Sequence, residues 1–338
     1  MPRVTKKETA RSASVDKSRR ITKSDGKFAD YSSLKAATGI VIPEVKKIML
    51  DRKKTESAST VRRGMYPSEM ALSDWCPRAT YYRMSGFPEP PSKYSFQLEN
   101  VFAQGNSVHD KWQTWLSETG KLWGDWKCYR CAAHVKDSLK PSEFYGGACI
   151  GTDWVKFEEL VTRRAGETPR SAMKDFSHDW RYREVTLKST TLPLSGHADA
   201  GLVDHNILVE LKSISAGSFR YSAPKLFESN THDVSGKKIS DADGMWKSFH
   251  APLTSHLKQG NLYLFMAKEM GLPFDRISFV YEYKANNQAK EFVVPYTYSI
   301  IEPILDTAHV VVDALAKGTP PPCPKGSCAS CKAYEGGK

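Results

Sequence analysis

Three charged residues around one predicted β-turn have the types and spacing of a catalytic group: Asp199, Glu210 and Lys212. Apolar residues on both sides of residues 204–206 (Asp-His-Asn) predict two short strands that meet at a tight turn. Alternation along the second strand places Glu210 and Lys212 on one face and Leu211 toward the core, while Asp199 is expected on the first strand. The pattern therefore brings two carboxylates and a lysine together.

Two carboxylates on neighbouring strands suit a hard divalent cation such as Mg²⁺ or Mn²⁺, which prefers oxygen ligands. A lysine beside them can hold or polarise an attacking water, so the group predicts metal-assisted cleavage of a phosphodiester. The alternative is that Glu210 and Lys212 form an ordinary ion pair on an edge strand. An acidic residue two positions before a lysine occurs six times in this chain, but only the copy at Glu210 follows a Gly-x-x-Asp motif, Gly196 to Asp199. We therefore favour the metal site.

Two predicted helices offer further groups to this site. Residues 98–117 form an amphipathic pattern that contains His109, and this histidine either points toward the site or lies in the core. Residues 252–270 form a second helical pattern, in which Gln259 and Tyr263 are four positions apart and share a face.

The chain has seven cysteines, and an odd number without an export signal argues for metal ligands or free thiols rather than disulfides. Cys128-x-x-Cys131 with Cys149 resembles half of a zinc ribbon, for which His134 is the candidate fourth ligand. Unligated thiols are the alternative for these three. The remaining cysteines are Cys76, Cys323, Cys328 and Cys331.

Basic charge is concentrated near the start of the chain. The formal net charge is +11 over 338 residues, and residues 1–63 hold 17 Lys and Arg against 7 Asp and Glu. Residues 1–60 predict a largely disordered arm, which either follows a phosphate backbone or is a solvated tail. No run approaches the roughly 18 apolar residues of a membrane span, and no signal peptide is evident, so we expect a cytoplasmic protein that contacts no membrane.

The folded domain is expected over residues 67–338, with a cysteine-containing insertion at about 121–180. Residues 213–252 are polar with interleaved basic and aromatic residues, which predicts either a lid that binds a nucleic-acid strand or a flexible surface insertion. Further elements are predicted as a strand over 182–187, a hairpin of 277–283 with 291–295, and a helix over 300–317 that ends at Gly318.

The motifs in chain order resemble those of the RecB-type branch of the PD-(D/E)XK nucleases: Gly105-x-x-x-His109, Gly196-x-x-Asp199, Glu210-Leu211-Lys212 and Gln259-x-x-x-Tyr263. The resemblance implies an α/β, restriction-endonuclease-like core, with a central mixed sheet flanked by helices. It implies that His109, Asp199 and Glu210 hold the cation and that Lys212 acts on the water. Gln259 and Tyr263 would contact the substrate or brace the site.

The cysteines extend this resemblance. Cys76-Pro-Arg-x-x-Tyr-Tyr, with Cys323, Cys328 and Cys331 near the end of the chain, is similar to the CRISPR-associated and AddB-like exonucleases, in which four such cysteines hold a 4Fe-4S cluster. The last three cysteines are spaced differently here, so zinc is the competing occupant. Either centre would join the two ends of the domain.

The resemblance as a whole implies a metal-dependent DNA exonuclease, similar to phage relatives, that acts on single-stranded or end-containing DNA in processing, recombination or repair. One alternative is a non-catalytic nucleic-acid-binding or recombination-accessory protein on the same fold, and another is a structural zinc protein. The presence of Asp199, Glu210 and Lys212 together favours the enzyme.

Overall fold

The computed structural model describes residues 41–59, 63–88, 95–129, 134–137, 180–231 and 242–335. The chain divides into two compact units, residues 1–49 and 50–338. In the first unit, only the beginning of helix α1 (Val41–Ser59) is described. The predicted disordered arm of residues 1–60 is therefore helical over 41–59, and residues 1–40 lie outside the described chain. The second unit holds every residue predicted to do chemistry.

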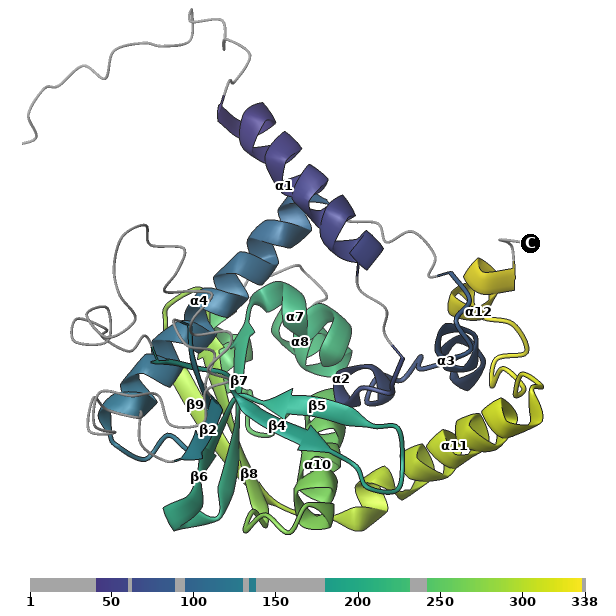
Figure 1. Ribbon diagram of the computed structural model, residues 1–338. Helices are drawn as coiled ribbons and strands as arrows, with labels where there is room; N and C mark the ends of the chain where they lie inside the picture. Colours follow the sequence, from purple (N-terminus) through teal and green to yellow (C-terminus); the bar gives the residue numbers. More distant parts are fainter. Residues whose placement is uncertain are drawn as a thin grey trace, which may run out of the picture. The chain divides into compact units, whose positions relative to one another are not determined.

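A four-stranded sheet forms the centre of the second unit (Figure 1). Its strands lie in the order β6 (Ala200–Leu202), β7 (Ile207–Ile214), β8 (Arg276–Tyr283) and β9 (Ala289–Pro295). β7 and β8 run parallel, whereas the other two pairs are antiparallel, which makes the sheet mixed. Both predicted hairpins, β6–β7 and β8–β9, are confirmed.

Helices cover both faces of this sheet (Figure 1). The long helix α4 (Phe96–Glu118) packs on the face that carries Val209 and Leu211. Helix α10 (Thr254–Glu269) packs on the opposite face, which carries Leu208 and Ile214. Because successive side chains of β7 point to opposite faces of the sheet, they pack into an apolar core on each face. The predicted class, α/β with a mixed sheet flanked by helices, is confirmed.

Two smaller sheets precede the central one in the chain. The first has the order β2 (His134–Asp137), β1 (Gly124–Cys128), β3 (Trp180–Tyr182), and the second pairs β4 (Val185–Lys188) with β5 (Ser195–Ala198). The predicted insertion therefore begins and ends in paired strands, and residues 138–179 between them lie outside the described chain. The predicted strand over 182–187 is interrupted between β3 and β4.

Asp199 lies at a corner, and its predicted position on a strand is wrong. It falls between β5, which pairs with β4, and β6, which pairs with β7. Its backbone carbonyl accepts a hydrogen bond from Gln113 Nε2 of α4 at 3.0 Å. The chain passes from one sheet to the next at this residue, and α4 rather than a strand satisfies the carbonyl.

The described part of the segment at 213–252 beyond β7 folds into helices rather than a flexible insertion, and its role as a strand-binding lid stays a prediction. It forms α7 (Ala216–Ser222), α8 (Pro224–Thr231) and α9 (Ala242–Lys247), with residues 232–241 outside the described chain. Phe219, Trp246 and Phe249 are buried in the main core. These aromatic residues serve packing and are not available for bases to stack on.

The ends of the second unit lie together (Figure 1). α2 (Pro67–Met70) and α3 (Pro77–Met84) come from its first part, and α11 (Tyr298–Lys317) and α12 (Ala329–Glu335) come from its last. α11 ends at Gly318, whose φ of 65° is left-handed, as predicted. None of the described helices combines the length and the apolar character that crossing a bilayer requires.

Candidate active site and four-cysteine cluster

The carboxylate of Asp199 connects α4 to β7. Its Oδ1 lies 2.9 Å from His109 Nδ1, and its Oδ2 accepts the backbone N–H of Leu211 at 2.6 Å. Burial lowers the pKa of His109, but the hydrogen bond and charge of Asp199 outweigh burial, so that the pKa is raised overall. His109 therefore lies against a carboxylate rather than in the apolar core.

Glu210 and Lys212 project from the same face of β7, as predicted, and form a buried ion pair. Lys212 Nζ donates to Glu210 Oε1 at 2.6 Å. Burial raises the pKa of Glu210 to about 7, although Lys212 partly opposes this. Burial lowers the pKa of Lys212, but the charges of Glu210 and Asp199 raise it overall, so Lys212 stays protonated. This buried pair differs from the exposed pair that was the alternative.

Gln259 and Tyr263 lie on the face of α10 that meets this pair. The amide of Gln259 donates both to Glu210 Oε1 and to Tyr263 Oη, each at 2.9 Å. A Cβ on Gly196 would lie 2.8 Å from the Tyr263 ring, so the glycine of the Gly196-x-x-Asp199 motif makes room for this tyrosine. The structure thus brings all six motif side chains to one place.

Glu184 is a site residue that the sequence motifs missed. It lies between β3 and β4 with a left-handed φ of 65°, which is uncommon outside glycine and concentrates at functional sites. His109, Glu184 and Asp199 each offer a ligand atom, and these atoms lie within 4.8 Å of one another. Burial and the charge of Asp199 raise the pKa of Glu184. Glu184 falls inside residues 182–187, which were predicted as one continuous strand. Strand alternation alone does not mark it as a functional residue.

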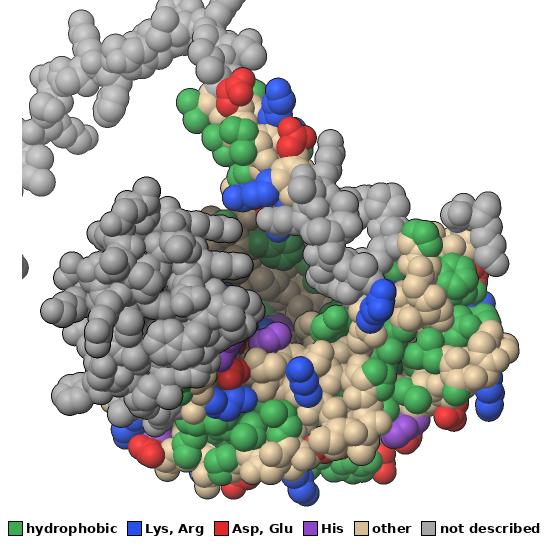
Figure 2. Space-filling view, viewed as in Figure 1, with side chains coloured by type: hydrophobic (Ala, Val, Ile, Leu, Met, Phe, Trp, Pro, Cys, Tyr) green, Lys and Arg blue, Asp and Glu red, His purple; other side chains and the backbone are tan. Residues whose placement is uncertain are grey.

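The ligand atoms of His109, Glu184 and Asp199 lie close enough together to hold a divalent cation. His109 Nδ1 and Asp199 Oδ1 are hydrogen-bonded at 2.9 Å, so the proton between them must leave before both atoms can bind an ion. Among the described residues, the buried Oε2 of Glu210 has no hydrogen-bond partner, and binding a cation would satisfy it. Histidine, acidic and basic side chains reach the surface together near the middle of the face in Figure 2.

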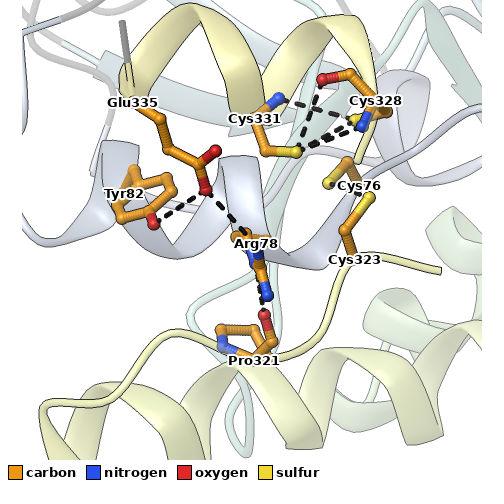
Figure 3. A network of polar contacts seen from close by, with 8 residues as sticks. All are labelled: Cys76, Arg78, Tyr82, Pro321, Cys323, Cys328, Cys331 and Glu335. Carbon is orange, nitrogen blue, oxygen red and sulfur yellow. Dashed lines mark hydrogen bonds and ion pairs between the residues drawn. The ribbon is translucent and has the colours of Figure 1, made fainter. Parts of the chain in front are cut away.

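A second cluster joins the two ends of the unit (Figure 3). The sulfur atoms of Cys76, Cys323, Cys328 and Cys331 lie within 4.8 Å of one another. Cys76 and Cys323 are 247 residues apart in sequence, and their sulfurs are 3.8 Å apart. Arg78 supports this contact, since its Nε donates to the Pro321 carbonyl at 2.9 Å.

Two sulfur pairs have the separation expected around one tetrahedral metal ion. Four sulfurs that each lie about 2.3 Å from a zinc ion are about 3.8 Å from one another, and the pairs Cys76–Cys323 and Cys328–Cys331 are 3.8 Å and 3.6 Å apart. In a 4Fe-4S cluster each cysteine binds a different iron, so the sulfurs must lie farther apart. The backbone N–H of Cys331 also points at Cys328 Sγ, at 3.5 Å.

The predicted zinc site of Cys128, Cys131 and Cys149 stays a prediction. Cys128 is fully buried at the end of β1, in the apolar cluster that includes Trp126 and Trp180. Cys131 and Cys149 lie outside the described chain, while His134, the candidate fourth ligand, is exposed on β2.

No protein-family model and no curated protein matches this chain. Among solved structures, the crystal structure of SSO0001 is similar to it with a TM-score of 0.35 and 13% identity, covering 81% of this chain and 87% of that one. An alkaline exonuclease (LHK-Exo) from Laribacter hongkongensis is similar with a TM-score of 0.27 and 13% identity, covering 48% of this chain and 67% of that one. Likenesses at these TM-scores carry no argument about function, which therefore depends on the geometry of the site.

Proposed function

We propose that this chain is a divalent-metal-dependent deoxyribonuclease of the RecB-type PD-(D/E)XK kind, and an exonuclease that acts at DNA ends during processing, recombination or repair. The observation that carries the proposal is the buried Oε2 of Glu210, which has no hydrogen-bond partner among the described residues and belongs to a carboxylate that interacts electrostatically with Asp199 and His109. A buried carboxylate oxygen without a partner is costly, and a bound cation removes that cost.

The cation, when bound, polarises the phosphodiester and lowers the pKa of a bound water. His109, Asp199 and Glu210 would hold it, with Glu184 as a further candidate ligand. Lys212 has a raised pKa and therefore acts as a cation that donates hydrogen bonds to the attacking water or to the charge that develops on the phosphate, not as a base. Gln259 fixes Glu210 Oε1, which leaves Oε2 for the metal.

We propose separately that the four-cysteine cluster binds one structural metal ion, with zinc favoured over a 4Fe-4S cluster. The sulfur distances support a single ion. Carboxylate chemistry at Asp199 and Glu210 needs no redox centre, and a centre that joins the two ends of the unit stabilises the fold.

Digestion of end-labelled DNA with Mg²⁺ or Mn²⁺ tests the proposed activity. Wild type should release labelled nucleotides from linear DNA and leave closed circular DNA uncut. Glu210→Gln and Lys212→Gln should each lower the rate by at least about 100-fold, because each removes a group that acts on the reacting atoms. Glu269→Gln, at the far end of α10 where it accepts from Thr191 Oγ1, is the matched control and should cut normally.

Two results would count against this function. Normal cutting by Glu210→Gln would contradict the assignment of Glu210 to the active site. Binding of DNA without cutting by wild type, in both metals, would support the accessory protein on the same fold.

A further inference from the structure

A groove of about 440 Å³ runs beside the candidate active site, between α4 and strand β3. The α4 wall includes Asp110 and Gln113, and the opposite wall includes Arg181 and Arg183. Tyr129, directly after β1, lies at its rim and is 46% exposed. No motif in the sequence pointed to this groove.

Three basic side chains surround Tyr129. The Arg181 guanidinium lies 4.6 Å from the centre of the tyrosine ring, and Lys127 Nζ lies 5.8 Å from it. Arg183 Nη1 donates to the tyrosine hydroxyl at 2.7 Å. An exposed aromatic ring among cations is the combination that binds single strands, since bases stack on the ring while the cations meet phosphates.

The sheet pairing concentrates this charge. Lys127 of β1 is directly opposite Arg181 of β3, and on its other side it is opposite His134 of β2.

The groove borders the elements that carry the candidate active site, although none of the proposed metal ligands lines it. Gln113, in its α4 wall, donates to the backbone carbonyl of Asp199. Asp110 and Arg183 in the lining are the immediate neighbours in sequence of His109 and Glu184.

We propose that this groove binds the single-stranded end of a DNA substrate, with a base stacked on Tyr129 and phosphates at Arg181 and Arg183. This proposal rests on the proposed function only for the claim that the bound strand is a nuclease substrate. Strand binding itself needs no catalysis. Unpaired bases are required because the base faces of a duplex are already stacked and cannot reach the tyrosine.

Fluorescence anisotropy of a labelled oligothymidine, measured with full-length protein in EDTA so that no cutting occurs, tests this binding. Tyr129→Ala should weaken binding by about 5-fold to about 100-fold, and Tyr129→Phe should retain most of it because the ring remains. Tyr221→Ala is the matched control. Tyr221 is also exposed and also lies beside an arginine, with Arg220 Cζ 6.0 Å from its ring, but it is on α7 outside the groove. The Tyr221→Ala protein should bind the oligothymidine as wild type does.

The arginines give an independent measurement. Arg181→Gln with Arg183→Gln should lower the slope of log affinity against log salt by about 1.4, since each phosphate contact on a single strand contributes about 0.7. Wild-type affinity in Tyr129→Ala, an unchanged salt slope in the double variant, or equal binding of a blunt duplex would each overturn the proposal.

The groove and the catalytic proposal fail in different ways. Hydrolysis of bis(p-nitrophenyl) phosphate with Mn²⁺ needs the catalytic residues but no strand, so Tyr129→Ala should keep this activity. Oligothymidine binding that depends on Tyr129, in a protein that hydrolyses neither substrate, would support the groove and remove the nuclease assignment.

Discussion

One carboxylate oxygen distinguishes a cation site from a structural ion pair here. Glu210 uses Oε1 for both Lys212 and Gln259, and its buried Oε2 has no partner in the part of the chain that the structure describes. A pair retained only for stability would be expected to satisfy both oxygens. The left-handed backbone of Glu184 beside Asp199 is a second feature that packing alone does not require.

Without a divalent cation, the protein should lose stability as the pH rises from about 4.5 to about 7. Burial raises the pKa of Glu210 to about 7, so the folded state keeps a proton that the unfolded chain releases near 4.5. The raised pKa of His109 acts in the same direction, because its stabilising charge is present at low pH and lost as the pH rises. Thermal unfolding in a chelator measures this dependence.

Glu210→Gln removes the titrating carboxyl and should flatten the pH dependence, whereas Glu269→Gln should preserve it. A metal-free protein that becomes more stable over the same pH range would contradict the raised pKa values at the site.

At the scale of single elements, periodicity predicted the side chains that regular structure positions. Alternation placed Glu210 and Lys212 on one face, and helical spacing placed Gln259 beside Tyr263. The misses fall where regular structure breaks: Asp199 at the corner between β5 and β6, and Glu184 in the gap between β3 and β4. Such positions are fixed by contacts distant in sequence, such as Gln113 with the Asp199 carbonyl.

The next prediction concerns the four-cysteine cluster, which joins the start of α3 to α12. Cys328→Ser should release the metal and lower the unfolding temperature by at least about 4 °C, because losing a crosslink between distant segments typically costs at least about 2 kcal/mol. Ser330→Ala, exposed on α12 and bearing no thiol, is the matched control. Unfolding scans and elemental analysis of both variants check this.

The single-ion assignment predicts a colourless protein with one zinc per chain. A brown protein with broad absorption near about 400 nm and about four irons would replace zinc by a 4Fe-4S cluster and keep the cluster's structural role. A metal-free wild type, with no effect of Cys328→Ser on stability, would contradict a metal centre at these cysteines.

For the molecule as a whole, the sequence predicted the fold class and the residues that meet at the candidate site, but not the path of a substrate. Basic and aromatic residues at 213–252 suggested a strand-binding surface, yet Phe219, Trp246 and Phe249 are core residues. Composition cannot distinguish a buried aromatic residue from an exposed one. Tyr129 and Arg181 are 52 positions apart, and only the pairing of β1 with β3 brings them together.

The central claim is that Asp199 helps to hold a divalent cation, and calorimetric titration of Mn²⁺ into the full-length protein tests it most directly. Asp199→Asn keeps an oxygen to accept the Leu211 N–H but removes the charge, and Asp125→Asn likewise keeps an acceptor for the Thr186 N–H outside the site. We predict that Asp199→Asn weakens Mn²⁺ binding by at least about 100-fold, since even changes behind the ligands cost about 10-fold to 100-fold, while Asp125→Asn binds as wild type does. Equal Mn²⁺ affinity in wild type and Asp199→Asn would contradict the claim.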